Sequence, residues 1–372
     1  MKKYFFYCLF LFCTTLNICA QTIPLTSEPG GGNKKASISE QIGIVKIEIN
    51  YHRPGVKGRE GKIWGTNIAH YGFKDLGFGT SIAAPWRAGA NENTTIQFSH
   101  PVKIEGKDLP AGIYGFFIAL GENESTLIFS KNATSWGSFY YEEEADALRV
   151  TVKNHTLQNS IEWLKYDFMN QTDSSLTIAL LWEKRMIPFK VEAETKKIQI
   201  ETFKKELKTT RFDSDFMIAA NYCLQHNIEL EQALEWIDRA IYSRVLGRKT
   251  FLSLNTRAEI LLRLNKIDEA KAMITEAVAY ESNMHEMHYY ARRFLNIGLI
   301  EEAFNYFKHN YNKYPNEVVA LIGMARAYSS KKDYSAALTL LKKAQLLAND
   351  DVNKNNIIAM IKKLEEGKDI NK

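Results

Sequence analysis

The chain is poor in cysteine, in proline and in net charge, and each shortage excludes a class of protein. It has 372 residues and four cysteines, of which Cys8, Cys13 and Cys19 fall in the first twenty residues. Beyond them stands only Cys223, so a disulfide framework within the rest of the chain is excluded. Eight prolines and 21 glycines exclude a collagen-like or Pro/Gly-rich low-complexity chain.

An excess of charge of one sign is also missing. Lys and Arg number 48 against 43 Asp and Glu, and neither side of residue 200 is clearly basic. Binding to nucleic acid independently of sequence needs a basic excess, so nucleic acid is disfavoured as a partner. After the N-terminal segment no run approaches 18 apolar residues, and no membrane span is expected. The length predicts two domains.

Residues 1–20 have the pattern of a secretory signal peptide. Lys2 and Lys3 precede an apolar run, and Ala20 stands before Gln21. We therefore expect an exported protein, periplasmic or secreted after cleavage near Ala20. A lipid anchor at Cys19 is the alternative, but the bulky Ile18 occupies a position where a small residue is expected.

From about residue 40 to residue 192, apolar and polar residues alternate with the period of half-buried strands. Eight such runs follow one another without a helical pattern between them. They are Val45–Tyr51, Thr94–Phe98, Ile113–Leu120, Thr126–Ser130, Leu148–Val152, Ile161–Phe168, Leu176–Trp182 and Met186–Val191. This spacing predicts an antiparallel β-sandwich or a barrel. Residues 21–39, which include three consecutive glycines, are predicted to be a flexible linker.

From about residue 210 the pattern is helical and repeats. Four alanines recur 37, 33 and 34 residues apart, at Ala233, Ala270, Ala303 and Ala337. In the last three units a small residue precedes this alanine by twelve positions, and a large one precedes it by nine. Seven residues after it the chain has Ala240, Ala277 and Ala344, with Asn310 as the exception. Residues 210–350 thus resemble the 34-residue tetratricopeptide repeat, whereas a generic helical bundle predicts no such period.

The ends of this repeat region can also be assigned. The first unit is longer than the others, and we place two extra residues in its turn, at Asn227–Glu231. Residues 351–372 are predicted to form a capping helix and a tail. Residues 193–209 are predicted to be a lysine-rich, partly helical linker. The fold class is therefore an antiparallel β-sandwich followed by an α-solenoid of helix-turn-helix repeats.

Several stretches of the first domain form a recognisable set: Tyr51–Arg59, Trp86–Glu92, Leu109–Tyr114, Trp136–Gly137 and Leu148–Val150. On these stretches the domain, from about residue 37 to 191, resembles a bacterial family named domain of unknown function 2911. The resemblance implies a secreted all-β domain, often from the Bacteroidetes and in some members followed by tetratricopeptide repeats. It implies no reaction. The stretch between Trp64 and Trp86 is longer than the family pattern, which predicts an enlarged loop before the signature.

The best candidate for a site is the signature Trp86-Arg87-Ala88-Gly89-Ala90-Asn91-Glu92. If the run is extended, Arg87 and Asn91 share a face. An indole, a guanidinium, an amide and a carboxylate together suit a sugar or a carboxylated ligand. The structural alternative is that Arg87 pairs with a carboxylate and Asn91 caps a turn.

Other clusters are weaker candidates. Arg53 and Arg59, with Lys57 between them, are predicted either to contact an anion or to be solvated charges on a rigid turn. The acidic run Glu142–Asp146 is predicted to be solvated, because consecutive carboxylates without a glycine do not fit a calcium loop. His285-Glu286-x-His288 has the wrong spacing for the zinc motif His-Glu-x-x-His. No metal or other cofactor is predicted.

These observations support two hypotheses on function. The leading one is a non-enzymatic binding or scaffold protein whose repeat groove holds a peptide or protein partner. The alternative is a ligand-binding or hydrolytic β domain centred on Arg87, Asn91 and Glu92, with the repeats as a docking arm.

Overall fold

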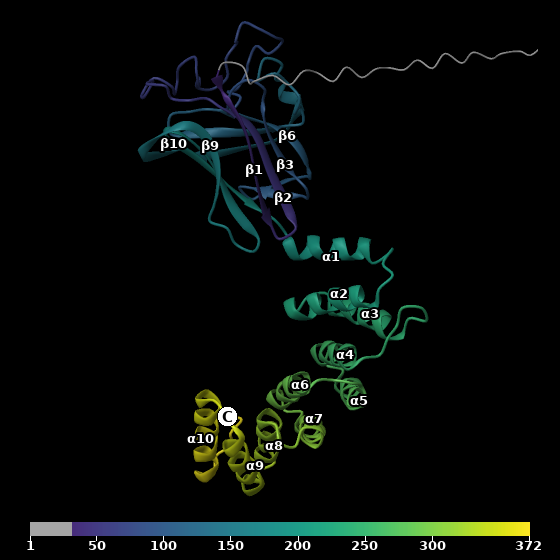
Figure 1. Cartoon of the computed structure of the whole chain (residues 1–372). Coiled ribbons are helices and arrows are strands. Elements are labelled where there is room, and N and C mark those ends of the chain that lie inside the picture. The colour runs from purple at the N-terminus through teal and green to yellow at the C-terminus, as the bar shows by residue number, and fades with distance from the viewer. Residues whose placement is uncertain (1–31) are drawn as a thin grey trace, which may run out of the picture. The chain divides into compact units, whose positions relative to one another are not determined.

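A computed structural model describes residues 32–372 (Figure 1). The chain divides into two compact units, the first ending at Ile198 and the second beginning at Gln199. The predicted signal peptide and residues 21–31 of the predicted linker lie outside the described residues. The rest of that linker departs from the prediction, since its last residues belong to strand β1 (Lys34–Ile42). Ala36 and Ile38 alternate with exposed neighbours there and pack against the core.

In its described part, unit 1 consists of two antiparallel sheets. The six-stranded sheet has the order β1-β2-β3-β6-β7-β8, and the four-stranded sheet has the order β5-β4-β10-β9. The further strands are β2 (Val45–Arg53), β3 (Thr94–Phe98), β4 (Val102–Ile104), β5 (Lys107–Leu109), β6 (Gly112–Ala119), β7 (Glu124–Ser130), β8 (Asp146–Lys153), β9 (His155–Met169) and β10 (Ser175–Glu192). The predicted antiparallel sandwich class is confirmed, and the sheets do not close into a barrel over residues 32–198.

One core lies between the two sheets. Val45, Ile47 and Ile49 of β2 point into it from one side, and Ile178 and Trp182 of β10 point into it from the other. All five side chains are fully buried. This arrangement explains the period-two pattern of the sequence, because successive side chains of a strand point to opposite faces of the sheet.

Two strand predictions need correction. The runs Leu176–Trp182 and Met186–Val191 are one strand, β10, with register shifts around Glu183. Glu183 has a φ of 49°, and its carboxylate accepts the Gly61 amide at 3.2 Å and the Trp64 indole N–H at 3.1 Å. Glu183, which interrupts the apolar pattern, therefore sits at a β-bulge within one continuous strand. The three-residue strands β4 and β5 are too short to show a periodicity, and the sequence did not reveal them.

Unit 2 consists of paired helices. Residues 193–209, predicted as a partly helical linker, contain α1 (Thr195–Glu206). The repeats are formed by α2 (Asp213–His226) with α3 (Leu230–Tyr242), α4 (Phe251–Arg263) with α5 (Ile267–Ala277), α6 (Met284–Asn296) with α7 (Ile300–Lys313), and α8 (Val318–Ser330) with α9 (Tyr334–Leu347). α10 (Asp351–Glu365) follows at the predicted place of the capping helix.

The repeat alanines occupy the positions that their spacing predicted. Ala233, Ala270, Ala303 and Ala337 are completely buried at the start of the second helix of each pair. Asn310, the exception in the pattern, is buried as well, and its Nδ2 donates to the Met284 carbonyl at 3.0 Å. A polar residue is tolerated there because that bond satisfies its amide.

The predicted insertion in the first turn is wrong. The turn between α2 and α3 spans three residues, as do the turns inside the other three pairs. The extra length lies instead in the connection between α3 and α4, residues 243–250. Asn221, twelve positions before Ala233, stands where the later repeats have alanine, which is why alignment on small residues misplaced the insertion.

Cys223 and the helix lengths complete the description of unit 2. Cys223 is completely buried in α2, as predicted, and burial raises the pKa of its thiol to about 11. The thiolate that reacts with oxidants and disulfides is therefore scarce at neutral pH. None of the helices within residues 32–372 is both long and apolar enough to cross a membrane.

Candidate functional site

The signature Trp86–Glu92 is a tight turn, and the extended conformation considered for it is wrong. Ala88 and Asn91 have left-handed backbones, with φ of 50° and 58°. The Ala88 carbonyl accepts hydrogen bonds from the Tyr166 hydroxyl at 2.8 Å and from Thr94 Oγ1 at 3.1 Å. At Gly89 a Cβ would lie 2.8 Å from that same Oγ1, so the turn has no room for a side chain there. Close backbone approach thus explains the glycine.

Arg87 is fixed by the turn and by one aromatic ring. Its Nη1 donates to the Asn91 carbonyl at 2.7 Å, and its guanidinium lies 4.7 Å from the centre of the Phe139 ring. A Cβ on Gly137, whose φ is 62°, would overlap the guanidinium at 2.1 Å. The Trp136-Gly137 motif therefore makes space for Arg87. Within residues 32–372 Arg87 forms no ion pair, so the alternative that it pairs with a carboxylate is not what the structure shows.

Four of the predicted residues meet at one cleft of about 420 Å³. Arg59, Trp86, Arg87 and Asn91 line it. Lys57, which the sequence grouped with Arg53 and Arg59, lines it as well, whereas sequence reasoning missed His70 and Trp182 as lining residues. The Trp182 ring stacks on Trp86 with centroids 6.2 Å apart, which forms an aromatic wall.

The other two predicted residues lie elsewhere. Glu92 faces a separate cleft of about 220 Å³ with His52. Its Oε2 is 2.7 Å from His52 Nε2, although the two groups are not aligned as a hydrogen bond, and Asn91 Nδ2 lies 2.8 Å from His52 Nδ1. Burial lowers the pKa of His52, and the Glu92 charge opposes that shift. Arg53 donates from Nε to the Leu164 carbonyl at 2.8 Å, a contact that joins β2 to β9.

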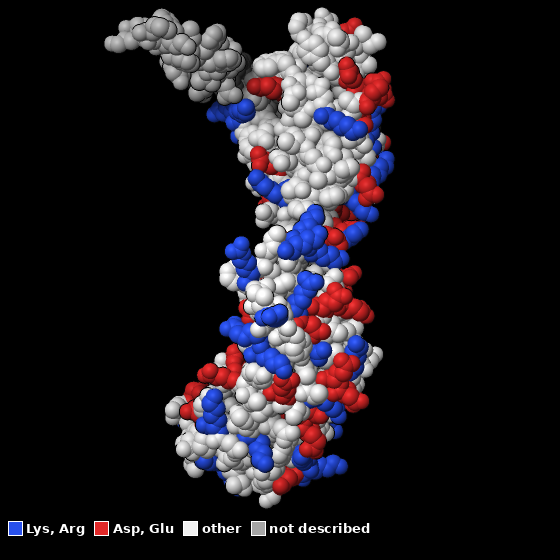
Figure 2. Space-filling model, turned by 90° about the vertical axis from the view of Figure 1, so that its right-hand side faces the viewer, with Lys and Arg blue, Asp and Glu red and all other residues white. Residues whose placement is uncertain are grey.

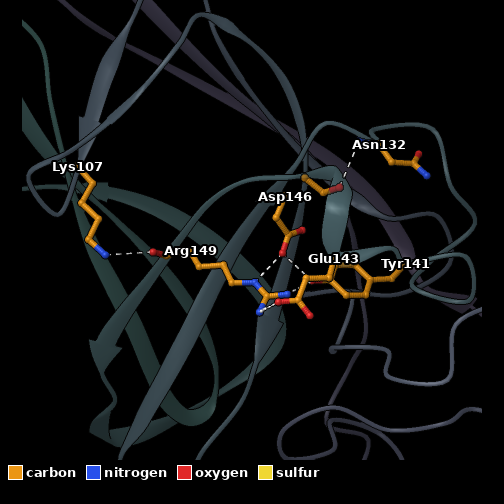
Figure 3. Close-up of polar contacts among 7 residues, drawn as sticks. Lys107, Asn132, Tyr141, Glu143, Asp146 and Arg149 are labelled. Carbon is orange, nitrogen blue, oxygen red and sulfur yellow. Dashed lines mark hydrogen bonds and ion pairs between the residues drawn. The ribbon is translucent and has the colours of Figure 1, made fainter.

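The acidic run next to β8 is only partly solvated, contrary to the prediction. Figure 3 shows Asp146 and Glu143 directed at the guanidinium of Arg149. Asp146 Oδ2 lies 2.6 Å from Arg149 Nε and accepts the Tyr141 hydroxyl at 2.7 Å, whereas the Glu143 side chain stays largely exposed. Burial raises the pKa of Asp146, against the effect of its hydrogen bonds from Tyr141 and Arg149. This cluster lies at the beginning of β8. It does not line either of the two clefts.

The repeats carry a second candidate site, formed by residues of α6 and α8. In Figure 1, α4, α6 and α8 follow the inside of the curve of unit 2, and the C-terminus lies on the same side. His288 and Arg292 of α6 and Arg326 of α8 influence one another electrostatically. Burial, together with the charges of Arg292 and Arg326, lowers the pKa of His288 to about 4. We call these three residues the inner-face cluster.

The last residues of the chain bind beside this cluster. The Ile370 amide donates to Ser329 Oγ at 3.0 Å, and Ser329 Oγ donates to Asp369 Oδ1 at 2.7 Å. The Asn371 side-chain amide donates to the Arg326 carbonyl at 3.0 Å. Ile370 is buried among apolar residues of the last repeat. The C-terminal segment therefore occupies α8 through both its backbone and its side chains.

The near-zinc motif has a structural role. Glu286 accepts the Asn283 amide at 3.1 Å, while Asn283 caps the start of α6 by accepting from the His285 and Glu286 amides. This reciprocal pair is a capping box. Within the part of the chain that the structure describes, no group of three or more His, Cys, Asp or Glu side chains is arranged to hold a metal ion.

The geometry defines a β domain with two aromatic and polar clefts, followed by tetratricopeptide-type helix pairs. Residues 33–191 match the family described as "Protein of unknown function (DUF2911)", which confirms the resemblance for the first domain. A comparison with curated proteins gave no match.

Several solved structures resemble the repeats. The C-terminal part of a TPR repeat-containing protein from Cytophaga hutchinsonii is 17% identical, with a TM-score of 0.36, over 46% of this chain and 67% of that one. YrrB, a TPR protein with an unusual peptide-binding site, is 17% identical, with a TM-score of 0.32, over 44% and 84%. A tetratricopeptide repeat protein from Parabacteroides merdae is 18% identical, with a TM-score of 0.33, over 41% and 60%. Identities this low concern the fold alone.

The close approach of Gly137 to Arg87 predicts an unequal cost for two Gly→Ala substitutions. Gly58→Ala introduces a side chain at a φ of 71° with nothing within 4 Å, so it costs only the left-handed backbone, about 1–2 kcal/mol. Gly137→Ala adds overlap with Arg87 and is expected to cost about 2 kcal/mol more. Urea unfolding followed by tryptophan fluorescence measures both, because five of the six tryptophans lie in unit 1. Equal costs would contradict the packing described.

The lowered pKa of His288 predicts a pH dependence of unit 2. In the unfolded chain His288 is protonated below about pH 6.5, whereas in the folded chain it is protonated only below about pH 4. The free energy of unfolding therefore falls as the pH drops from 6.5 to 4. The groups acting on His288 are Arg292, Arg326 and His285, all basic. Between pH 7 and pH 5 we expect a loss of about 1–2 kcal/mol.

Chemical denaturation at the two pH values, followed by far-UV circular dichroism, measures this loss. His288→Gln is expected to flatten the dependence, whatever it does to the stability at pH 7. A slope that is unchanged in the variant would assign the effect to other groups.

Proposed function

We propose that this is an exported binding protein rather than an enzyme, and that its repeats hold an extended, acidic segment of a protein partner on the inner face of unit 2. The observation that carries the proposal is the seat of the C-terminal segment on α8. There the Ser329 hydroxyl accepts from a backbone amide and donates to a carboxylate, and apolar residues of the last repeat enclose an aliphatic side chain.

Charge explains why the partner segment is acidic. The inner-face cluster brings three basic side chains together, and Asp369 is the carboxylate that acts on Arg326. Burial and Arg292 both disfavour the charged form of Arg326, so another carboxylate there would relieve both effects. On the face of the repeats that Figure 2 displays, Lys and Arg lie among Asp and Glu.

A peptide made from the C-terminal segment tests this proposal. We expect an acetylated peptide of residues 366–372 to bind a chain that ends at Gly367, because the truncation vacates the seat on α8. The full-length chain, whose own segment fills the seat, is expected to bind at least about tenfold more weakly. Fluorescence anisotropy of a labelled peptide measures both.

Variants locate the binding. Asn in place of Asp369 in the peptide, or Arg292→Gln in the truncated chain, is expected to weaken binding several-fold, since each removes one charge of an attractive set. Lys308→Gln on α7 removes the same charge from an exposed position in the second helix of that pair, and is expected to leave binding unchanged. Absence of binding to the truncated chain, or equal binding by Arg292→Gln and the parent, would refute the proposal.

The export part of the proposal rests on residues 1–20 alone. We expect the mature protein recovered from outside the cytoplasm of its native cells to begin at Gln21, because Ala20 supplies the small residue that signal cleavage requires. N-terminal sequencing of that protein tests this. A product that still begins at Met1, or that remains in the cytoplasm, would contradict it.

A further inference from the structure

We infer that the 420 Å³ cleft of unit 1 is a binding site for a small anion of about the size of a sugar acid, held by Arg87. This inference is independent of the proposed peptide site on the repeats. It rests on an arginine without a counterion within residues 32–372, on residues lining the cleft whose buried polar atoms have no partner in that part of the chain, and on the sign of the charges around it.

The first observation concerns Arg87. Its one hydrogen bond within residues 32–372 goes from Nη1 to the Asn91 carbonyl, which leaves the remaining N–H groups of the guanidinium available at the cleft wall. Burial disfavours its charged form, and none of the described carboxylates compensates. Arg87 is partly buried, and a charge withdrawn from water in this way is stabilised when it is paired. A carboxylate or a phosphate matches the planar fork of a guanidinium with two parallel hydrogen bonds.

The second observation concerns two buried polar atoms. Trp182 is completely buried and His70 is more than nine-tenths buried, and both line the cleft. Trp182 Nε1 and His70 Nδ1 have no hydrogen-bond partner within residues 32–372. Buried polar groups in folded proteins are nearly always bonded, and an orphan of this kind calls for a ligand or an ordered water. An indole N–H can only donate, so the bound group must supply an acceptor.

The third observation is the sign of the charge. Arg87, Arg59 and Lys57 all line the cleft, and no acidic residue of the described chain does. Arg59 donates from Nε to the Val56 carbonyl and from Nη2 to the Gly55 carbonyl. It therefore contributes positive charge to the cleft more than free hydrogen-bond donors. Lys57 is exposed at the rim. The cleft therefore attracts anions and fixes them at Arg87.

The size and the walls of the cleft narrow the ligand class. Its volume lies within the range of small-molecule sites and suits one monosaccharide with an acidic group. Trp86 and Trp182 supply an apolar wall for the ring, and Asn91, whose amide also contacts His52 and Asn33, lines the same cleft. Glu92 takes no part, because it faces the other cleft.

Calorimetric titration of the full mature chain tests the inference with three probes: glucuronate, glucose 6-phosphate and glucose. We expect at least one of the two anions to bind and glucose to bind at least about tenfold more weakly, because glucose lacks the charge that pairs with Arg87. Binding of glucuronate alone would identify a carboxylate as the ligand group, and binding of glucose 6-phosphate alone would identify a phosphate.

Variants separate a site from a general attraction. Arg87→Gln is expected to reduce anion affinity at least about tenfold, with its fold checked by circular dichroism. Because Arg87 also contacts Phe139 and Asn91, a second variant is needed that leaves the turn untouched. Lys57→Gln at the rim is expected to weaken binding about two- to fivefold. Lys62→Gln removes the same charge from an exposed position off the cleft and is the matched control.

Two results would overturn the inference. One is that neither anion binds the folded parent chain. The other is that the anions bind the folded Arg87→Gln and Lys57→Gln variants as tightly as they bind the parent. Neither result bears on the peptide site, whose residues all lie in unit 2.

Discussion

The buried carbonyl of Ala88 is the group on which the β-domain site depends. It belongs to a residue with a left-handed backbone, and two hydroxyls from different parts of the unit, those of Tyr166 and Thr94, converge on it. The strain of that conformation is of order 1–2 kcal/mol and is offset because two hydrogen bonds hold the buried oxygen. Of the two residues before Ala88, Trp86 is buried in the core and Arg87 lines the cleft.

The segment between β2 and β3 shows how a long connection can be well defined without strands of its own. Residues 54–93 form only isolated bridges, such as that of Trp86 with Ile118. Their order comes from tryptophan packing and from single bonds to distant residues, such as that of the Trp64 indole to Glu183. The position of Arg87 also requires glycine at residue 137, because the Arg87 guanidinium fills the space that a side chain there would occupy. A site built in this way depends on contacts from four separate parts of the chain.

The sequence predicted the repeats better than the cleft, for a physical reason. Helix pairs are stabilised by contacts between neighbours along the chain, so Ala270 and Ala303 show their burial through spacing alone. The cleft depends on long-range packing. Composition and motif brought Arg59, Trp86, Arg87 and Asn91 forward, and these four residues line one cleft, although the site itself stays a proposal. Glu92 follows Asn91 in the chain but faces the other way, because Asn91 reverses the backbone.

The residues that reasoning missed carry no local signal. Trp182 has the same inward alternation as any core residue of β10. Only its indole nitrogen, which has no hydrogen-bond partner within residues 32–372, sets it apart. His70 stands in a glycine-containing loop without a partner motif. The C-terminal segment could be predicted only as a tail, since nothing in Asp369-Ile370-Asn371 indicates that Ser329 and Arg326 lie within reach.

The attachment of that segment to α8 has a thermodynamic consequence. A group tethered a few residues from its binding place acts at an effective concentration in the millimolar range. Any partner that binds at the same place on α8 competes with the C-terminal segment. The measured dissociation constant of that partner then equals the intrinsic constant divided by the fraction of molecules whose segment is released. Only partners that are locally abundant or multivalent would then occupy the repeats. Substitutions in the last five residues would change the partner concentration needed to occupy the repeats, although they would alter none of the partner's own contacts.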